Sequence, residues 1–324
     1  MIRTLGLLVL STAIVGCGTE TYVLGTRDSY LFTARDALAL PGEQVRLQAR
    51  LQGGDFLLDM PGYVVRFARD GKLYRAAQTN DEGLATVTFT PPEPGDYLFV
   101  AETAPVGFSD SPPQPQELLV ACREPDTPMA VVDLDKTLVA DGFHSVLIGD
   151  PQPMPDSVEV MQRLASDHTI VYLTHRPDVF TNKSKSWLAE HGYPPGPVLL
   201  SSVSEFLKGS GAYKTEMLRE LTSRFDEIRV GIGDKVSDAQ AYYDTGLESI
   251  CILPMPARDD PQQYEMLAEK VSTLPGEVHV VTDWGEVRGV LFDGLTFPPS
   301  RIVERLKSKA AELEAAEKSA GGQP

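Results

Sequence analysis

Cysteine, basic residues and long apolar runs are all scarce in this sequence of 324 residues. There are 3 cysteines, and 46 acidic residues outnumber 29 basic ones, which gives a formal net charge of −17 at pH 7. This charge repels nucleic-acid phosphates and attracts divalent cations, so we expect no nucleic-acid partner. Beyond the N-terminal segment, no apolar run is long enough to cross a bilayer.

The N-terminal segment has the pattern of a targeting signal. Arg3 precedes an apolar run over residues 5–15, and Ile14-Val15-Gly16 lies directly before Cys17. This resembles the lipobox of bacterial lipoproteins, which implies a signal peptide of residues 1–16, lipidation of Cys17 and a membrane anchor in the bacterial cell envelope. Gly18 slightly favours the outer membrane. The alternative is an ordinary secretory signal with an incidental cysteine.

The other two cysteines, Cys122 and Cys251, each adjoin an apolar run. An oxidising compartment would permit a disulfide between them. A free cysteine, however, is commonly a small core residue, so we expect the two to be unpaired.

Residues 17–127 predict an all-β domain that ends in a linker. Turn residues such as Asp70-Gly71 separate short segments that alternate apolar and polar side chains, which is typical of a β-sandwich. The predicted strands span residues 44–51, 64–68, 73–75, 85–90, 97–100 and 118–121. Residues 79–100 resemble bacterial immunoglobulin-like domains, which implies a spacer or binding module. No cluster of catalytic residue types occurs here, and the partner of this domain is unknown.

Residues 128–300 predict a second, α/β domain, because buried strands now alternate with helices. The predicted strands span residues 129–132, 170–173, 198–200 and 228–232, and the predicted helices include residues 158–165 and 215–225. This pattern favours a Rossmann-like parallel sheet. We interpret residues 283–306 as a loop followed by a helix, and residues 301–324 as a helical or disordered solvated tail.

Polar residues follow three of the predicted strands of this domain. Asp133 and Asp135 follow the first, Thr174 the second, and Asp234 and Asp238 the fourth, while Lys214 opens a predicted helix. In a parallel sheet these strand ends meet in one crevice. Each residue alone has another interpretation: the acids as a cation-binding or helix-starting loop, Thr174 as a helix N-cap, and Lys214 as a solvated lysine.

In chain order these residues resemble the four motifs of the haloacid dehalogenase superfamily, D-x-D-x-T, Ser/Thr, Lys and G-D-x-x-x-D. The resemblance implies a magnesium-dependent phosphatase that works through an aspartyl-phosphate. It gives the residues these roles: Asp133 is the nucleophile, Asp135 the general acid and base, Thr174 and Lys214 hold phosphoryl oxygens, Asp133, Asp135 (through its carbonyl) and Asp234 bind Mg²⁺, Thr137 shapes the loop behind the nucleophile, and Asp238 orients Lys214 or the second metal shell.

The segments over residues 138–169 and 177–213 are too short to contain a cap domain, so the site is expected to be open and to suit large substrates or head groups. Residues 171–177, 186–188, 196–201 and 233–242 resemble the catalytic region of lipins, the phosphatidate phosphatases. This implies a phosphorylated substrate, with phosphatidate or a related phospholipid as one possibility.

The sequence departs from lipins at two positions. Lys136 replaces a glycine, and Asp234 stands where lipins have asparagine. Relatives that bind phosphatidate without hydrolysing it lack the second aspartate of the first motif, so Asp135 favours an enzyme. The alternative is a non-catalytic surface lipoprotein that binds phosphate or phospholipid. His175 and Arg176, next to Thr174, contact either the substrate or only solvent.

Overall fold

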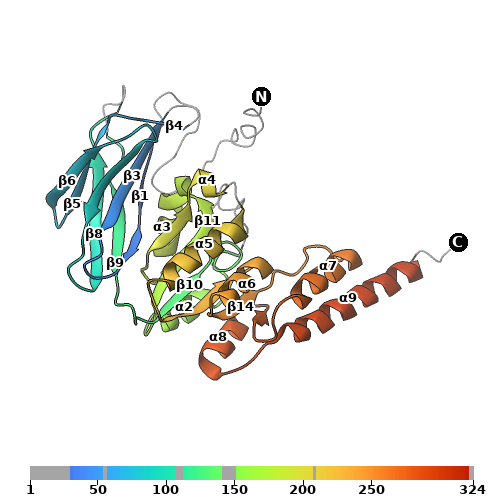
Figure 1. Ribbon diagram of the computed structural model, residues 1–324. Helices are drawn as coiled ribbons and strands as arrows, with labels where there is room; N and C mark the ends of the chain where they lie inside the picture. The colour runs from blue at the N-terminus through green and yellow to red at the C-terminus, as the bar shows by residue number, and fades with distance from the viewer. Residues whose placement is uncertain (1–29, 54–56, 107–111, 141–150, 207–208, 321–324) are drawn as a thin grey trace.

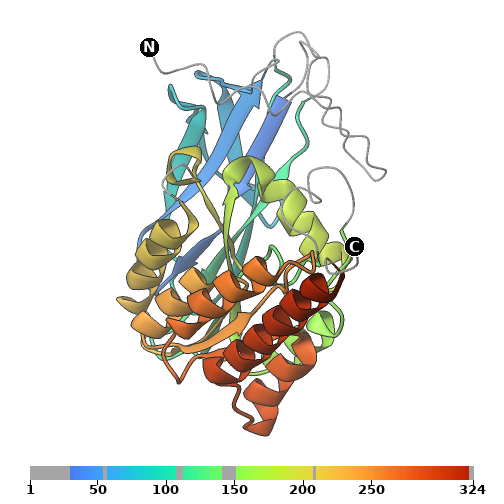
Figure 2. The ribbon, with the colours of Figure 1, turned by 90° about the vertical axis from the view of Figure 1, so that its right-hand side faces the viewer.

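The computed structural model describes residues 30–53, 57–106, 112–140, 151–206 and 209–320. A β-sandwich packs beside an α/β domain, and a pair of C-terminal helices lies at the end away from the sandwich (Figures 1 and 2). The expected signal peptide and Cys17 lie outside the described residues. Within the described residues, no helix is both long and apolar enough to span a membrane.

The sandwich consists of two sheets with one core between them. One sheet has the order β1-β3-β4 with β7 also paired to β3, and the other has the order β2-β9-β8-β5-β6. The strands are β1 (Tyr30–Arg35), β2 (Ala37–Ala39), β3 (Val45–Gly53), β4 (Leu58–Asp59), β5 (Val64–Arg69), β6 (Lys72–Gln78), β7 (Leu84–Phe89), β8 (Gly95–Thr103) and β9 (Gln116–Cys122). Alternate residues such as Val65, Phe67 and Phe99 fill the core. The sequence did not predict β1 or β2.

The α/β domain is built on a parallel sheet in the order β12-β11-β10-β13-β14-β15. Its strands are β10 (Met129–Val132), β11 (Thr169–Pro177), β12 (Val198–Ser201), β13 (Ile228–Gly233), β14 (Glu248–Ile252) and β15 (His279–Val281). The first four coincide with the predicted strands. Every residue of β10 is buried, because helices cover both faces of the sheet.

One face packs against α2 (Ser157–Leu164), α3 (Thr181–Glu190) and α8 (Trp284–Asp293), and the other against α5 (Ser210–Thr222) and α6 (Val236–Asp244). The predicted helix over residues 215–225 is confirmed but begins earlier, at Ser210. Lys214 therefore lies in the second turn of α5 and does not open it.

The C-terminal prediction was partly wrong. The expected loop after residue 283 is helix α8, whose N-cap Asp283 accepts a hydrogen bond from the Glu286 N–H at 2.9 Å. Helix α9 (Pro299–Ala320) is not a solvated tail along its whole length. Its buried residues Ile302, Leu306 and Ala310 pack in one cluster with α7 (Pro261–Ser272). Their spacing of four residues puts them on one helix face, which gains stability by leaving water.

The sandwich covers the edge strand β12 of the parallel sheet. Asp36, between β1 and β2, accepts hydrogen bonds from the Val198 N–H at 3.0 Å and the Leu119 N–H at 2.8 Å, and from Lys185 Nζ at 2.6 Å. Leu38 and Ala121 of the sandwich share an apolar cluster with residues of β10 and β11. An exposed sheet edge would offer unpaired backbone groups, so this cover closes it. Cys122 and Cys251 are buried and unpaired, as expected.

Candidate functional site

Three neighbouring strands bring the predicted site residues to one edge of the parallel sheet. β10 lies between β11 and β13, and Asp133, just after β10, donates its N–H to the Ile232 carbonyl of β13 at 2.9 Å. Asp234 directly follows β13, and Thr174 lies in the C-terminal half of β11. Because the three strands are adjacent and parallel, their carboxyl ends place these three residues at the same edge of the sheet.

Lys214 holds two of the acids. Its Nζ lies 2.7 Å from Asp133 Oδ2 and 2.5 Å from Asp238 Oδ2, and its side chain is 0% exposed. Burial alone would lower the pKa of Lys214, but Asp133, Tyr242 and Asp238 raise it, and the net pKa is well above the usual value. The lysine is therefore a permanent cation whose position is fixed by two carboxylates.

Asp133, Asp234 and Asp238 form a cluster that could hold a metal ion. One carboxylate oxygen from each lies within 4.8 Å of the others, and all three residues are buried. Asp234 Oδ1 is buried and has no hydrogen-bond partner among the described residues. Burial, and next the charge of Asp133, raise the pKa of Asp234 to about 7. A buried carboxylate oxygen without a donor is suited to a hard divalent cation such as Mg²⁺.

Asp135 is held by Arg176, a residue to which the sequence gave no definite role. Arg176 Nη2 lies 2.7 Å from Asp135 Oδ1, its Nε lies 3.0 Å from Oδ2, and its Nη1 donates to Ser184 Oγ at 2.9 Å. The Arg176 side chain is 1% exposed and that of Asp135 is 21% exposed. Two parallel N–H···O contacts fix the plane of the carboxylate, so Arg176 sets the orientation of Asp135 and does not face solvent.

The two threonines are fully buried at this edge. Thr174 Oγ1 accepts the Arg176 N–H at 3.3 Å, a contact within the C-terminal end of β11. The Thr137 carbonyl accepts the Trp284 indole N–H at 2.8 Å, while its Oγ1 has no partner among the described residues. Thr137 thus joins the loop behind Asp133 to helix α8.

His175 lies beside the site with its ring against two others. It stacks on Phe206 with ring centroids 4.9 Å apart and contacts Tyr213 at 5.8 Å. Burial lowers the pKa of His175, so the imidazole is mainly neutral at pH 7. Its Nε2 is buried and has no hydrogen-bond partner within the described part of the chain.

The backbone at Lys136 has the conformation expected of the glycine that lipins carry at this position. Its φ is 56°, in the left-handed region. A glycine adopts this conformation without a Cβ clash, whereas a lysine pays roughly 1 kcal/mol or more. The loop after Asp135 therefore keeps the turn that a glycine would make most easily.

The sequence gave no role to Asp178, Ser184 or the arginines that reach the loop from the sandwich. Asp178 accepts from Arg35 and Arg50, which lie 143 and 128 residues away in the chain. Local patterns carry no information on such contacts. The run Arg176-Pro177-Asp178, which begins two residues after Thr174, was the one signal in the sequence.

A known protein domain resembles the part of the chain that contains these site residues. Residues 130–253 match the family model described as "PITM 1-3, LNS2 domain", a domain of the lipin-like, haloacid-dehalogenase-type phosphatase family. The human "Membrane-associated phosphatidylinositol transfer protein 3" is 27% identical over 130 residues. This alignment covers 39% of the chain but only 13% of that protein.

Similar solved structures contain immunoglobulin- or fibronectin-like domains. The fibronectin(III)-like modules of Clostridium thermocellum CbhA are 12% identical, with a TM-score of 0.21 and coverage of 29% of this chain and 96% of that one. The Ig1-2 module of the Drosophila receptor protein tyrosine phosphatase DLAR is 13% identical, with a TM-score of 0.24 and coverage of 33% and 59%. These TM-scores are too low to support an argument about the fold. The β-sandwich is therefore described from its own strand pairing alone.

Proposed function

We propose that this protein is a magnesium-dependent phosphomonoesterase that works through an aspartyl-phosphate on Asp133. The observation that carries the proposal is the arrangement of Asp133, Lys214 and Asp234: a buried carboxylate lies 2.7 Å from a lysine and beside an acid with an unpartnered oxygen. A structural ion pair would not need the third, uncompensated acid. A phosphate site needs all three, because the attacking group and the substrate are both anions.

Each side chain then has a defined task. Asp133 attacks phosphorus and carries the phosphoryl group, while Lys214 and Thr174 hold the phosphoryl oxygens. Asp135, oriented by Arg176, gives a proton to the leaving oxygen and later takes one from the water that hydrolyses the aspartyl-phosphate. Mg²⁺ held by Asp133, Asp234 and the Asp135 carbonyl would offset the repulsion between the nucleophile and the phosphate. Asp238 keeps Lys214 in place.

The proposed substrate is phosphatidate or another phospholipid with a terminal phosphate. Two features support it: the likeness of residues 130–253 to a lipin-like domain, and the lipobox-like segment before Cys17, which would anchor the protein to a membrane of the cell envelope. No cap domain occurs among the described residues 151–206, which contain only α2, α3, α4 (Val203–Phe206), a short 3₁₀ turn and two strands. A site without a cap can accept a large head group.

A second candidate is phosphate or phospholipid binding without turnover. The name of the human relative supports it, since that name describes a lipid transfer protein and not a hydrolase. The presence of Asp135, held in a fixed orientation by Arg176, supports the enzyme, because pure binding has no use for a general acid.

The test is phosphate release by the chain carrying Cys17→Ser, which keeps the protein free of lipid. Phosphatidate in mixed micelles and an aryl phosphate are assayed with Mg²⁺ and with EDTA. We expect release that requires Mg²⁺, with a higher kcat/KM for phosphatidate. Equal activity in EDTA would refute the metal requirement. Binding of phosphatidate with no release from either substrate would favour the second candidate.

A further inference from the structure

Two arginines of the β-sandwich reach into the α/β domain and meet one buried carboxylate. Asp178 Oδ2 lies 2.5 Å from Arg35 Nη2 and 3.3 Å from Arg50 Nη1, and its side chain is 2% exposed. Arg35 is on β1 and Arg50 on β3, and Arg50 is paired with Thr33, two residues from Arg35. The two arginines therefore project from the same face of adjacent strands.

Asp178 directly follows the C-terminal end of β11, which carries the site residues Thr174 and Arg176. It begins the 3₁₀ turn Asp178–Phe180, directly after β11, and its carbonyl accepts Thr181 Oγ1 at 2.6 Å. Arg176, two residues earlier, holds the Asp135 carboxylate. Ser201 Oγ of β12 donates to the His175 carbonyl at 2.9 Å. The end of β11 and the turn at Asp178 are thus held by β12 on one side and by the sandwich on the other.

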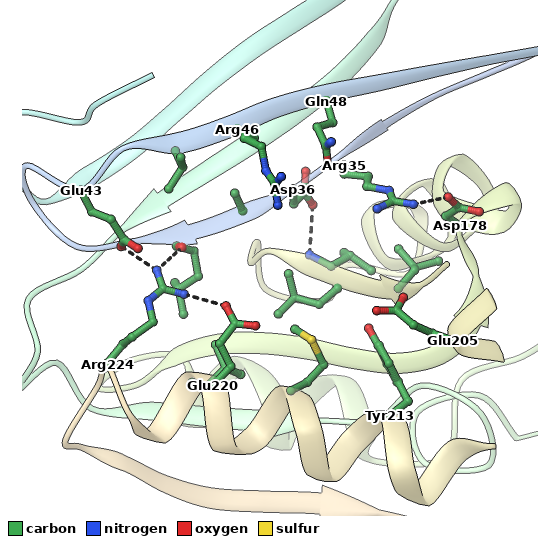
Figure 3. A pocket seen from close by; sticks show the side chains of 18 of the residues that line it. Arg35, Asp36, Glu43, Arg46, Gln48, Asp178, Glu205, Tyr213, Glu220 and Arg224 are labelled. Atoms are coloured by element: carbon green, nitrogen blue, oxygen red, sulfur yellow. Dashed lines mark hydrogen bonds and ion pairs between the residues drawn. The ribbon is translucent and has the colours of Figure 1, made fainter. Parts of the chain in front are cut away.

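A second interdomain ion pair provides a comparison. Arg224, at the end of α5, lies 2.6 Å from Glu43 of the sandwich, and this pair and the Arg35–Asp178 pair lie at opposite ends of a cavity of about 340 Å³ (Figure 3). Both pairs join the same two domains. Of these two pairs, only Arg35–Asp178 adjoins the end of β11 that bears Thr174 and Arg176.

We propose that the β-sandwich is a positioning element of the active site, in which Arg35 and Arg50 hold Asp178 and thereby set the C-terminal end of β11, which presents Thr174 and orients Asp135 through Arg176. This inference rests on the proposed phosphatase function for its catalytic consequence. Its structural part, the fixing of residues 174–178 by the sandwich, is independent of catalysis. Burying the Asp178 carboxylate without a cation would cost free energy. Loss of the arginines must therefore shift the segment around Asp178 or admit water to it.

The first measurement is steady-state kinetics of the full chain with Cys17→Ser, as wild type, Arg35→Gln, Arg35→Lys, Asp178→Asn and Glu43→Gln. Misplacement of a catalytic group by about 1 Å can cost about 100-fold in rate, so a partial shift should lower kcat by about 10- to 100-fold and change KM less. We expect this for Arg35→Gln and Asp178→Asn, partial recovery in Arg35→Lys, and unchanged kinetics for Glu43→Gln. Equal losses in Glu43→Gln would assign the effect to domain docking in general and overturn the proposal.

The second measurement is hydrogen exchange of the same proteins, read by mass spectrometry. We expect faster exchange in peptides covering residues 169–184 for Arg35→Gln and Asp178→Asn, and no change there for Glu43→Gln. Unchanged exchange in all variants overturns the proposal, whether or not the wild type hydrolyses phosphate. An inactive wild type with faster exchange in Arg35→Gln instead refutes the phosphatase and leaves the positioning role supported.

Discussion

The Lys214 ammonium lies between Asp133 and Asp238, at 2.7 and 2.5 Å, and none of these three side chains is more than 3% exposed. Asp234 adds a third carboxylate to the cluster. One lysine therefore faces three buried acids. The negative charge that remains is the physical reason to expect a divalent cation at this point of the fold.

Lys214→Met is expected to destabilise the metal-free protein by roughly 3–5 kcal/mol, because it leaves Asp133 and Asp238 buried without a cation. The free energy of unfolding is measured by urea titration at pH 8 in EDTA. The double variant Lys214→Met with Asp238→Asn should recover part of the loss, since one of the stranded charges is gone. A loss below about 1 kcal/mol in the single variant would mean that the pair is not buried as described.

Stability should depend on pH through Asp234. The pKa of this acid is raised in the folded protein to about 7, chiefly by burial, from roughly 3.9 in the unfolded chain. A group of this kind contributes stability below its unfolded pKa and loses it as the pH rises through its folded pKa. The Tm of the metal-free protein should therefore fall between pH 5 and pH 8, and fall less in Asp234→Asn.

Mg²⁺ provides the complementary test of Asp234. Binding requires the ionised carboxylate, so Mg²⁺ should raise the wild-type Tm more at pH 8 than at pH 5.5. The expected difference is about 2 °C or more, the shift that roughly 1 kcal/mol produces in a domain of this size. Asp244→Asn, an exposed acid on α6, is the matched control and should respond as the wild type does. Equal Mg²⁺ stabilisation of Asp234→Ala, whose side chain has no oxygen to offer the ion, would exclude this acid as a ligand.

Asp135→Asn should affect substrates according to their leaving groups. A general acid contributes about 10²- to 10⁴-fold when the leaving oxygen needs a proton, and much less when it does not. We therefore expect a large fall in kcat for an alkyl phosphate and a small one for an aryl phosphate with an acidic phenol. Arg176→Gln should show the same selectivity more weakly, because it releases the Asp135 carboxylate without removing it. Equal losses on both substrates would contradict the general-acid role.

Cys122 and Cys251 should not react in the folded protein. Both are buried and unpaired, and burial raises the pKa of each thiol. In the Cys17→Ser protein, a thiol reagent should modify neither cysteine at pH 8 until urea unfolds the chain, after which both react. Reaction of only one, or of neither, in urea without reductant would point to a disulfide or to another modification.

The sequence was most informative where the signal was local. The apolar runs before Asp133 and Asp234 predicted β10 and β13, and because parallel strands have their carboxyl ends at one edge of the sheet, the acids were expected to lie together there. The helix α8 was missed, because its glycines, Gly285 and Gly289, weaken the helical pattern. The packing of α8 favours a glycine at position 289, because a Cβ there would lie 2.9 Å from the Leu295 side chain.

Contacts across the two domains were beyond the reach of sequence patterns. Arg35 occurs in a strand that no alternation made evident, and its partner Asp178 follows a strand of the other domain. In the sequence, neither Arg35 nor Asp178 can be told from a charged residue on the protein surface. Only the packing of β1 and β3 against the segment after β11 buries Asp178, whose side chain is 2% exposed, beside an Arg35 side chain that stays 32% exposed.

The most direct test of the central claim is to trap the phosphoryl group on Asp133. Protein carrying Cys17→Ser is mixed with ³²P-labelled substrate and Mg²⁺, quenched in acid within milliseconds, and digested for peptide mapping. The account predicts label on the peptide that contains Asp133, its removal by hydroxylamine, and no label in Asp133→Asn. Phosphate release that persists in Asp133→Asn, or label on another residue, would contradict it.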